Sequence, residues 1–220
     1  MRMRKKKWAE PYLEAHSDYA ISDPSIHQGK WKQLLGKEEL HVEIGAGKGG
    51  YMLAMSLLYP DAGWVGIERD HSAAAVACRK AIEERGGCEN RRLIAGNAEE
   101  MEAWFKEGEI DVIHLNFSDP WPKKRNHKKR LSSEKFLFMY KKLLAHDGYI
   151  LMKTDNKDLF EDSVISFIQH GFTLTEISVD YRRNEHPEDA VTEYEQKFLE
   201  EGMPIYHLTA VPIRDSSVVE

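Results

Sequence analysis

A glycine-rich turn between two apolar runs constrains the fold of this chain most. The segment VEIGAGKGG (residues 42–50) ends a run that is typical of a strand and opens a run that is typical of a helix. Its Gly45, Gly47 and Gly50 fit the pattern G-x-G-x-x-G of nucleotide-binding turns. A tight strand-to-helix turn needs glycine for conformational reasons alone, so the turn by itself is a weak signal. Glu68 strengthens it, because an acid about 20 residues further on binds ribose hydroxyls in such sites.

The turn belongs to an alternation of apolar runs and helical patterns, which predicts βαβ units and a parallel sheet. Strands are predicted at residues 40–44, 64–68, 92–95, 110–116, 148–153, 173–179 and 205–212, and helices at 50–58, 72–84, 98–105, after Ser132 and Ser133 as a capped helix, at 157–169 and near 192–200.

These elements predict an α/β fold, a doubly wound and mostly parallel seven-stranded sheet. The last two strands lack a full crossover helix between them, so we expect an antiparallel edge strand. Residues 1–37 show no strand pattern and are expected to form a basic N-terminal arm packed near the active site. Residues 38–220 are expected to form a single domain.

The charge distribution is uneven. The 220 residues carry a net charge of −6, yet residues 2–7 hold five Lys or Arg and residues 123–130 hold six. Without these eleven cations the rest carries −17. An acidic body with two dense basic runs suggests local contact with a polyanion, although an N-terminal run is as readily a solvated tail.

Other features of the composition narrow the class of protein. The 2 cysteines are too few for a disulfide framework, which fits a reducing compartment and a cytoplasmic location. We see no run of 18 apolar residues and no signal peptide, so we expect no membrane segment. No His, Cys and Asp cluster has metal-ligand spacing, so no metal is expected.

The charge of the turn bears on its ligand. Glu43 stands two residues before Gly45, where a pyrophosphate would meet unwelcome negative charge. A carboxylate there suits a cationic ligand such as S-adenosylmethionine better than NAD. Asn97 follows the third predicted strand, and it can pair with adenine or cap the next helix, or do both.

The fourth predicted strand runs into a rigid acidic loop, NFSDPWP (residues 116–122). The two prolines restrict the backbone around Trp121 and hold Asp119 in place. An acid beside an aromatic ring suits a flat base, although a buried Trp packed in a turn is the simpler interpretation of Trp121 alone.

Taken together, these motifs resemble those of the bacterial tRNA (guanine-N7-)-methyltransferase family. The matching elements are VEIGAGKGG (42–50), GIERD (66–70), SDPWPKKRNHKKR (118–130), MKTD (152–155) and VTEYEQKF (191–198). The resemblance extends from about residue 5 to the end of the chain, with Asn126 and Asn97 as small departures. It implies a Rossmann-like class I methyltransferase that methylates guanine at position 46 in the variable loop of tRNA.

The resemblance also implies roles for individual residues. S-adenosylmethionine would be held by Glu43, Glu68, Asn97 and Asp119, in addition to Gly45 and Gly47 of the turn; Asp119 would be the catalytic acid; the substrate would meet Lys123, Asp155, Thr192, Glu193, Tyr194 and Glu195; and the tRNA would meet Arg125, His127, Lys128, Lys129 and Arg130.

Methylation of guanine at ring nitrogen 7 requires no catalytic triad, and we see none in the sequence. Ring nitrogen 7 of guanine is an exposed acceptor, so its lone pair attacks without prior deprotonation. We therefore expect Asp119 to position the guanine and stabilise its developing positive charge, with proton removal secondary. Asp155 could instead cap a helix, and Thr192 to Glu195 could serve only to start one.

Three other functions stay open at the level of sequence. They are an NAD-dependent oxidoreductase, a methyltransferase of another RNA or of protein, and an RNA-binding module without activity. The sequence leaves both a monomer and a homodimer open.

Overall fold

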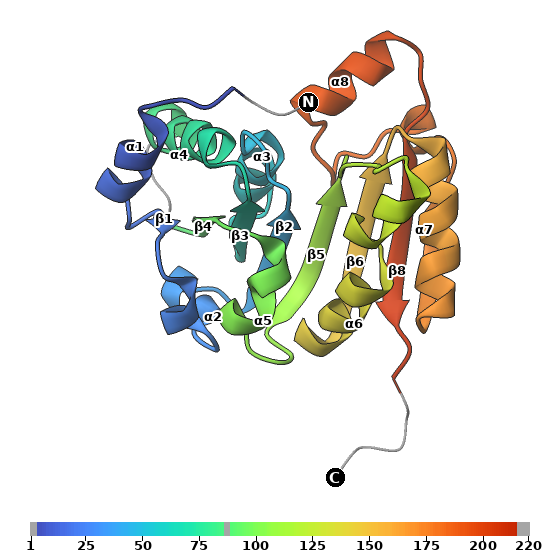
Figure 1. Cartoon of the computed structure of the whole chain (residues 1–220), viewed down its shortest axis with the longest axis horizontal. Helices are drawn as coiled ribbons and strands as arrows, with labels where there is room; N and C mark the ends of the chain where they lie inside the picture. The colour runs from blue at the N-terminus through green and yellow to red at the C-terminus, as the bar shows by residue number, and fades with distance from the viewer. Residues whose placement is uncertain (1–3, 86–88, 215–220) are drawn as a thin grey trace.

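The computed structural model describes residues 4–85 and 89–214, and it contains one eight-stranded sheet (Figure 1). The strands are β1 (Ala20–Ile21), β2 (Glu39–Ile44), β3 (Ala62–Glu68), β4 (Arg91–Ala95), β5 (Ile110–Asn116), β6 (Leu144–Thr154), β7 (Phe172–Ser178) and β8 (Tyr206–Pro212). The α-helices are α1 (Ala9–Ala15), α2 (Trp31–Leu35), α3 (Gly50–Leu58), α4 (His71–Arg85), α5 (Met101–Trp104), α6 (Glu134–Leu143), α7 (Lys157–Gln169) and α8 (Glu193–Glu200). Short 3₁₀ turns are η1 (Pro24–His27), η2 (Ala98–Glu100), η3 (Lys124–Lys129) and η4 (Tyr181–Arg183).

The sheet has the order β1-β4-β3-β2-β5-β6-β8-β7. The pairs from β1 to β6 are parallel, while β8 pairs antiparallel with both β6 and β7. The predicted α/β class, the mostly parallel sheet and the antiparallel element at one edge are confirmed. Strands β2 and β5 are neighbours, but α3, which follows β2, packs on one face of the sheet, and α6, which follows β5, packs on the other. In open α/β sheets, ligands bind in the crevice that forms at the carboxyl ends of two such strands.

The eighth strand corrects the expectation that residues 1–37 contain none. Ala20 and Ile21 pair in parallel with Leu93 and Ile94 of β4, and the amide of Leu93 also bonds to the carbonyl of Tyr19 at 3.0 Å. Two residues are too few to show a period-2 pattern, so only tertiary pairing reveals this strand. In the same segment α1 packs against α4, and α2 packs against β2 and β3.

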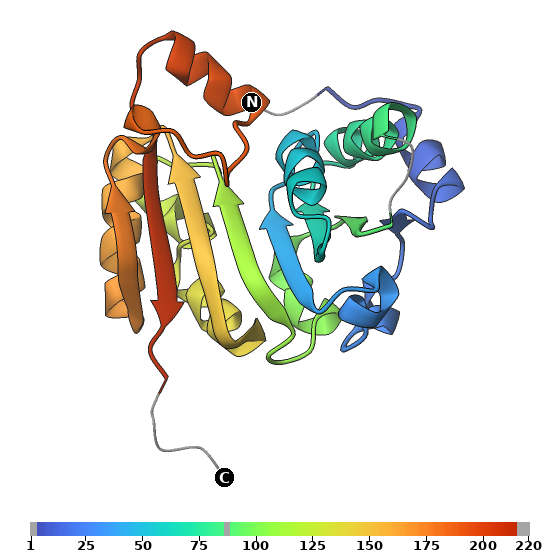
Figure 2. The same ribbon diagram turned by 180° about the vertical axis from the view of Figure 1, so that it is seen from behind.

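Strand alternation divides the buried side chains between two faces of the sheet. On one face, Val42, Ile113 and Met152 pack with residues of α2, α5, α6 and α7. On the other, apolar residues of α1, α3 and α4 pack on the β3 and β4 side, including Trp64. Figure 2 shows the second face, where no α-helix covers β5, β6 and β8 in the way that α3 and α4 cover their neighbours.

Polar residues occupy that part of the second face. The alternate positions of the central strands there are His41, Glu43, His114, Asn116, Lys153 and His207, all buried. Among the described residues, no helix is long and apolar enough to cross a membrane.

Candidate active site

The glycine-rich turn joins β2 to α3 at the carboxyl edge of the sheet. Gly45, Gly47 and Gly49 have φ of 82°, 56° and 74°, a region that side chains other than glycine adopt only with strain. A Cβ at Gly49 would lie 2.9 Å from the Cβ of Ala77, so this glycine also permits close packing of the turn on α4. The third essential glycine is therefore Gly49, whereas Gly50 of the sequence motif lies within the helix.

Glu43 carries an unusual carboxylate at the end of β2. Its side chain is buried, Oε1 accepts a hydrogen bond from Asn116 Nδ2 at 3.2 Å, and Oε2 has no hydrogen bond among the described residues. Burial raises the pKa of Glu43 to about 7, against the opposing influence of Asn116, Lys153 and the Met52 amide. A buried acid left half-unpaired fits a cationic group of a ligand.

Glu68 lies at the end of β3 and faces the same turn. Its Oε2 accepts from the Gly47 amide at 2.8 Å and its Oε1 from the Asp70 amide at 2.7 Å. Two backbone donors fix the carboxylate in one orientation, while its remaining lone pairs can accept from ribose hydroxyls.

Asn97 follows β4 at the same edge and caps η2. Its Oδ1 accepts from the Glu99 amide at 3.3 Å, so the capping role considered for it is present. Capping uses only the oxygen, so the side-chain nitrogen takes no part in the cap.

The loop after β5 places Asp119 between two strained residues. Phe117 and Trp121 are the two non-glycine residues with positive φ in the described chain, at 49° and 41°. Such strain costs on the order of 1–3 kcal/mol per residue and clusters at functional sites. Asp119 is exposed, and the half-buried Trp121 lies under Lys129, whose Nζ is 4.7 Å from the ring centroid.

Arg130 differs from the other cations of the basic run. It is only 5% exposed; its Nε donates to the Pro120 carbonyl at 2.7 Å and its Nη1 to Asp162 at 2.5 Å. The predicted contact of Arg130 with RNA is therefore at odds with its position, because its guanidinium already holds the loop. A pocket of about 260 Å³ lies behind the loop, lined by Pro120 and Arg130 but by none of the residues of the glycine-rich turn.

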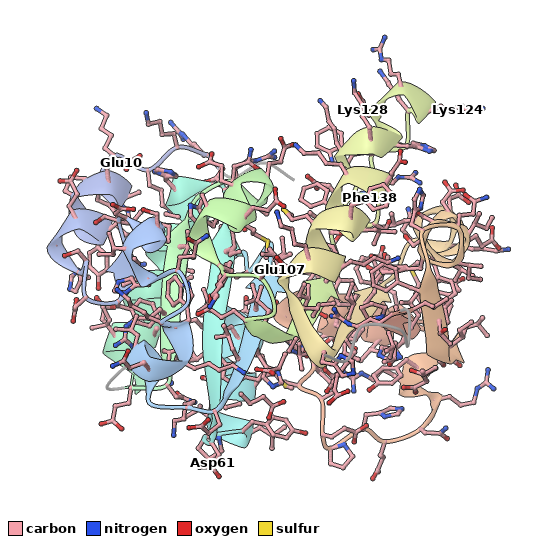
Figure 3. The ribbon with its side chains drawn as sticks, turned by 90° about the horizontal axis from the view of Figure 1, so that it is seen from below. Glu10, Asp61, Glu107, Lys124, Lys128 and Phe138 are labelled. Carbon is pink, nitrogen blue, oxygen red and sulfur yellow. The ribbon has the colours of Figure 1, made fainter. Side chains whose placement is uncertain are left out.

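The other Lys and Arg side chains of the basic run are accessible to solvent. Lys123, Lys124, Arg125, Lys128 and Lys129 are exposed, and His127 is half-buried with Nδ1 3.7 Å from Asp162. Figure 3 shows Lys124 and Lys128 on the outermost part of this segment, beyond Phe138 of α6.

Asp155 directly follows β6, and Tyr194 lies in the first turn of α8. Asn156, not Asp155, caps α7, accepting from the Leu159 amide at 2.8 Å. Burial raises the pKa of the half-buried Asp155. Burial raises the pKa of Tyr194, and the charges of Asp155 and Asp119 raise it further.

Two aromatic residues at this point were missed from the sequence. The Phe117 ring lies 5.5 Å from that of Tyr194, and the Phe198 ring lies 5.0 Å from it. Phe117 stands inside the NFSDPWP motif, which was the only signal that pointed to it.

The four residues Thr192 to Glu195 divide into two groups. Thr192 and Glu195 form a capping box at the start of α8, and Glu195 is fully buried against Lys153 and Arg182. Glu193 and Tyr194 are exposed, and Glu193 pairs with Lys80.

The residues present fit S-adenosylmethionine. The cation would meet the unpaired oxygen of Glu43, and a Cβ built at Gly45 has no described atom within 4 Å, so the turn keeps an open surface. Among the described residues, no group of three His, Cys, Asp or Glu is placed to hold a metal ion.

Known proteins resemble this chain over nearly its whole length. A family model described as "Putative methyltransferase" matches residues 37–208. The tRNA (guanine-N(7)-)-methyltransferase of Geobacillus kaustophilus is 44% identical over 99% of this chain and 100% of its own. The enzyme of the same name from Limosilactobacillus reuteri is 42% identical over 96% and 99%.

Solved structures match the fold at low sequence identity. An antibiotic-related methyltransferase superimposes with a TM-score of 0.63 at 14% identity, covering 84% of this chain and 94% of its own. The 16S rRNA (adenine(1408)-N(1))-methyltransferase of Catenulisporales acidiphilia gives a TM-score of 0.59 at 14% identity, covering 90% and 94%. With the class I methyltransferase fold in place and two relatives above 40% identity, the chain belongs to the tRNA (guanine-N7-)-methyltransferase family.

Proposed function

We propose that this protein transfers the methyl group of S-adenosylmethionine to ring nitrogen 7 of a guanine in tRNA, at position 46 of the variable loop. The observation that carries the proposal is the placement of four carboxylates at one edge of the sheet: Glu43 and Glu68 lie at the ends of β2 and β3, and Asp119 and Asp155 follow β5 and β6. A cytoplasmic location belongs to the same proposal, because tRNA and the methyl donor meet there.

Three side chains and two glycines would hold the donor. Glu43 would bind the ammonium group, Glu68 the ribose hydroxyls and Asn97 the adenine, while Gly45 and Gly47 leave room for the ligand against the backbone. When bound, S-adenosylmethionine supplies an electrophilic methyl group on a sulfonium sulfur.

Asp119 and Asp155 would orient the guanine. The N1–H and the exocyclic amino group of guanine are donors, and carboxylates accept from them while nitrogen 7 is left free. The lone pair of nitrogen 7 attacks without losing a proton, and the product base is cationic. The two carboxylates therefore stabilise charge that develops during the reaction, which is the largest kind of catalytic contribution in most enzymes.

Tyr194 and the basic run would hold the RNA. The Tyr194 ring is half-exposed and backed by Phe117 and Phe198, an arrangement on which an unstacked base can stack. Lys123 and the exposed cations that follow it can each meet a phosphate.

Incubation of the purified protein with S-adenosylmethionine and unmodified tRNA, followed by nucleoside mass spectrometry, tests the proposal. We expect N7-methylguanosine, mapped to the variable loop by nuclease digestion. Methylation of ribosomal RNA but not tRNA would overturn the acceptor. A lack of S-adenosylhomocysteine binding would overturn the donor.

A further inference from the structure

Four buried charges form a closed ring beneath α8. Lys153 of β6 and Arg182 of η4 supply the cations; Asp189 and Glu195 supply the anions. Their side chains are 3%, 9%, 11% and 0% exposed, respectively.

Each carboxylate accepts hydrogen bonds from both cations. Asp189 Oδ2 accepts from Lys153 Nζ and from Arg182 Nη2, both at 2.5 Å. Glu195 accepts from Arg182 Nε at 2.6 Å and from Lys153 Nζ at 3.3 Å. The other oxygen of Asp189 accepts from the Tyr51 hydroxyl at 2.8 Å. The charges balance and the carboxylates are bonded, as buried charges require.

The ring is the buried attachment of α8 to the rest of the protein, while nearer the surface Phe117 packs against Tyr194 and Lys80 pairs with Glu193. Glu195 is the one buried side chain of this helix, whereas α7 buries four. An ordinary surface helix docks through an apolar face. Here the docking group is a carboxylate, and its Oε2 also accepts from the Thr192 amide at 3.2 Å, which fixes the first turn. Figures 1 and 2 show α8 lying across the carboxyl ends of β5 and β6.

The same ring is linked through the backbone to all three residues that would contact guanine. Tyr194 precedes Glu195 in the first turn of α8, and Asp155 lies two residues after Lys153. The Lys153 carbonyl accepts from the Phe117 amide at 2.8 Å, where the loop of Asp119 begins. A buried ion cluster contributes little net stability compared with apolar packing, so its value lies in fixing geometry.

We propose that Lys153, Arg182 and Asp189 are positioning residues that hold Glu195, and through it the start of α8, so that Tyr194 is held at the same edge of the sheet as Asp119 and Asp155. Glu195 then acts on the helix, not on the guanine. This inference rests on the proposed function, because the readout is methylation of tRNA.

The test compares Arg182→Met with Arg183→Met. Arg183 is the adjacent residue, its side chain is 69% exposed and it contacts only Asp180, at 3.3 Å, among the described residues. We expect Arg182→Met to lower kcat/KM for tRNA at least tenfold while the Kd of S-adenosylhomocysteine stays within twofold. Arg183→Met should leave both within threefold. Wild-type activity of both variants would overturn the inference, whereas an inactive wild type would overturn the proposed function.

A double-mutant cycle separates positioning from general destabilisation. If the ring acts through Tyr194, then adding Arg182→Met to Tyr194→Ala should lower kcat/KM by no more than about twofold further, because the group to be positioned is already gone. Losses that multiply would overturn the inference.

Glu195→Gln keeps the shape of the side chain and serves if Arg182→Met does not fold. In the ring, Glu195→Gln should also be non-additive with Tyr194→Ala and leave donor binding unchanged. A multiplicative loss in that pair would mean that Glu195 touches the substrate itself.

Discussion

Asp119 is the residue on which the proposed chemistry depends most. It stands exposed between Phe117 and Trp121, whose strained backbones hold it at the crevice. Asp119→Asn keeps the shape but removes the charge that opposes the positive charge of the product. We expect turnover to fall roughly 10²–10³-fold, the usual cost of one preorganised electrostatic group. Single-turnover methylation of tRNA measures it.

The matched control for that substitution is Asp147→Asn. The Asp147 side chain is 100% exposed, and it lies where the pairing of β6 with β5 is interrupted, between Leu144 and Tyr149. It should leave turnover unchanged. Near-normal turnover of Asp119→Asn, with normal binding of S-adenosylhomocysteine, would remove Asp119 from the catalytic role.

Glu43 predicts a pH dependence of donor binding. Its pKa is about 7 in the free protein because it is buried, and a ligand ammonium binds the charged form. Binding must therefore release a proton below pH 7, and affinity should rise with pH up to about 7 and then level off. At pH 6 the Kd of S-adenosylhomocysteine should be about tenfold above its plateau, by calorimetric titration.

Glu43→Gln is the control for this pH dependence, since it should bind weakly and almost equally across a range of about 1.5 units either side of the pKa of about 7. Stability of the free protein should show the opposite trend. The raised pKa favours the neutral form in the folded state, so the contribution of Glu43 is present at low pH and lost as pH rises through 7. A pH-independent Kd in the wild type would exclude Glu43 as the partner of the ammonium.

The burial and the partners of individual charged residues could not be predicted from the sequence. Arg130 and Glu195 belong to motifs whose other Lys, Arg, Asp and Glu residues are exposed, and nothing in the local sequence tells that these two are buried in ion pairs. Asp155 and Asn156 are adjacent candidates for one cap, and only the structure assigns it to Asn156. The carboxylates and glycines of the crevice were predictable because strand ends and turn chemistry place them. Their individual binding roles stay predictions.

At the scale of elements, the sequence predicted long periodic segments well, but it did not predict elements that depend on tertiary pairing. Strand β5 and helix α7 begin and end where the sequence indicates, since their apolar patterns are strong. Strand β1 exists only through β4. The expected cap of α6 is absent in detail, because Ser133 makes no cap bond and instead donates to the Lys128 carbonyl at 3.1 Å. A local backbone carbonyl, five residues earlier in the chain, accepts from that hydroxyl in place of the cap.

The weak docking of α8 leads to a prediction about its cap. Thr192→Ala removes the bond from the Glu195 amide to Thr192 Oγ1, 2.8 Å long, at a cost of about 1 kcal/mol. Because α8 buries only Glu195, this cost should appear as local opening, with α8 amides exchanging hydrogen about fivefold faster and global unfolding unchanged. Asn156→Ala removes the cap of the well-buried α7 and should instead lower global stability by about 1 kcal/mol. An equal loss of global stability in both variants would show that α8 unfolds with the core.

At the scale of the whole molecule, charge and fold together point to the edge of the sheet that we propose faces the RNA. The basic run leaves the sheet at the carboxyl end of β5, the edge that also carries the crevice. Lys6 reaches the same edge, since its amide donates to Ser72 Oγ at the start of α4, at 2.9 Å. The division into an arm at 1–37 and a domain at 38–220 stays a prediction, as does the oligomeric state. The acidic remainder of the surface would repel RNA that approaches from elsewhere.

This arrangement predicts how salt affects tRNA binding. If about four of the exposed cations meet phosphates, log K should fall against log salt with a slope near −3. Lys128→Ala should reduce the magnitude of that slope by about 0.7–0.9, whereas Lys142→Ala, an exposed lysine of α6 paired with Glu102, should leave it unchanged. Arg130→Ala should lower Tm and turnover without changing the slope, because its guanidinium holds Pro120 and Asp162 instead of RNA. Filter-binding or fluorescence titrations at five salt concentrations or so measure the slope. Equal reductions for Lys128→Ala and Arg130→Ala would mean that the loop rearranges on RNA and releases its buried arginine.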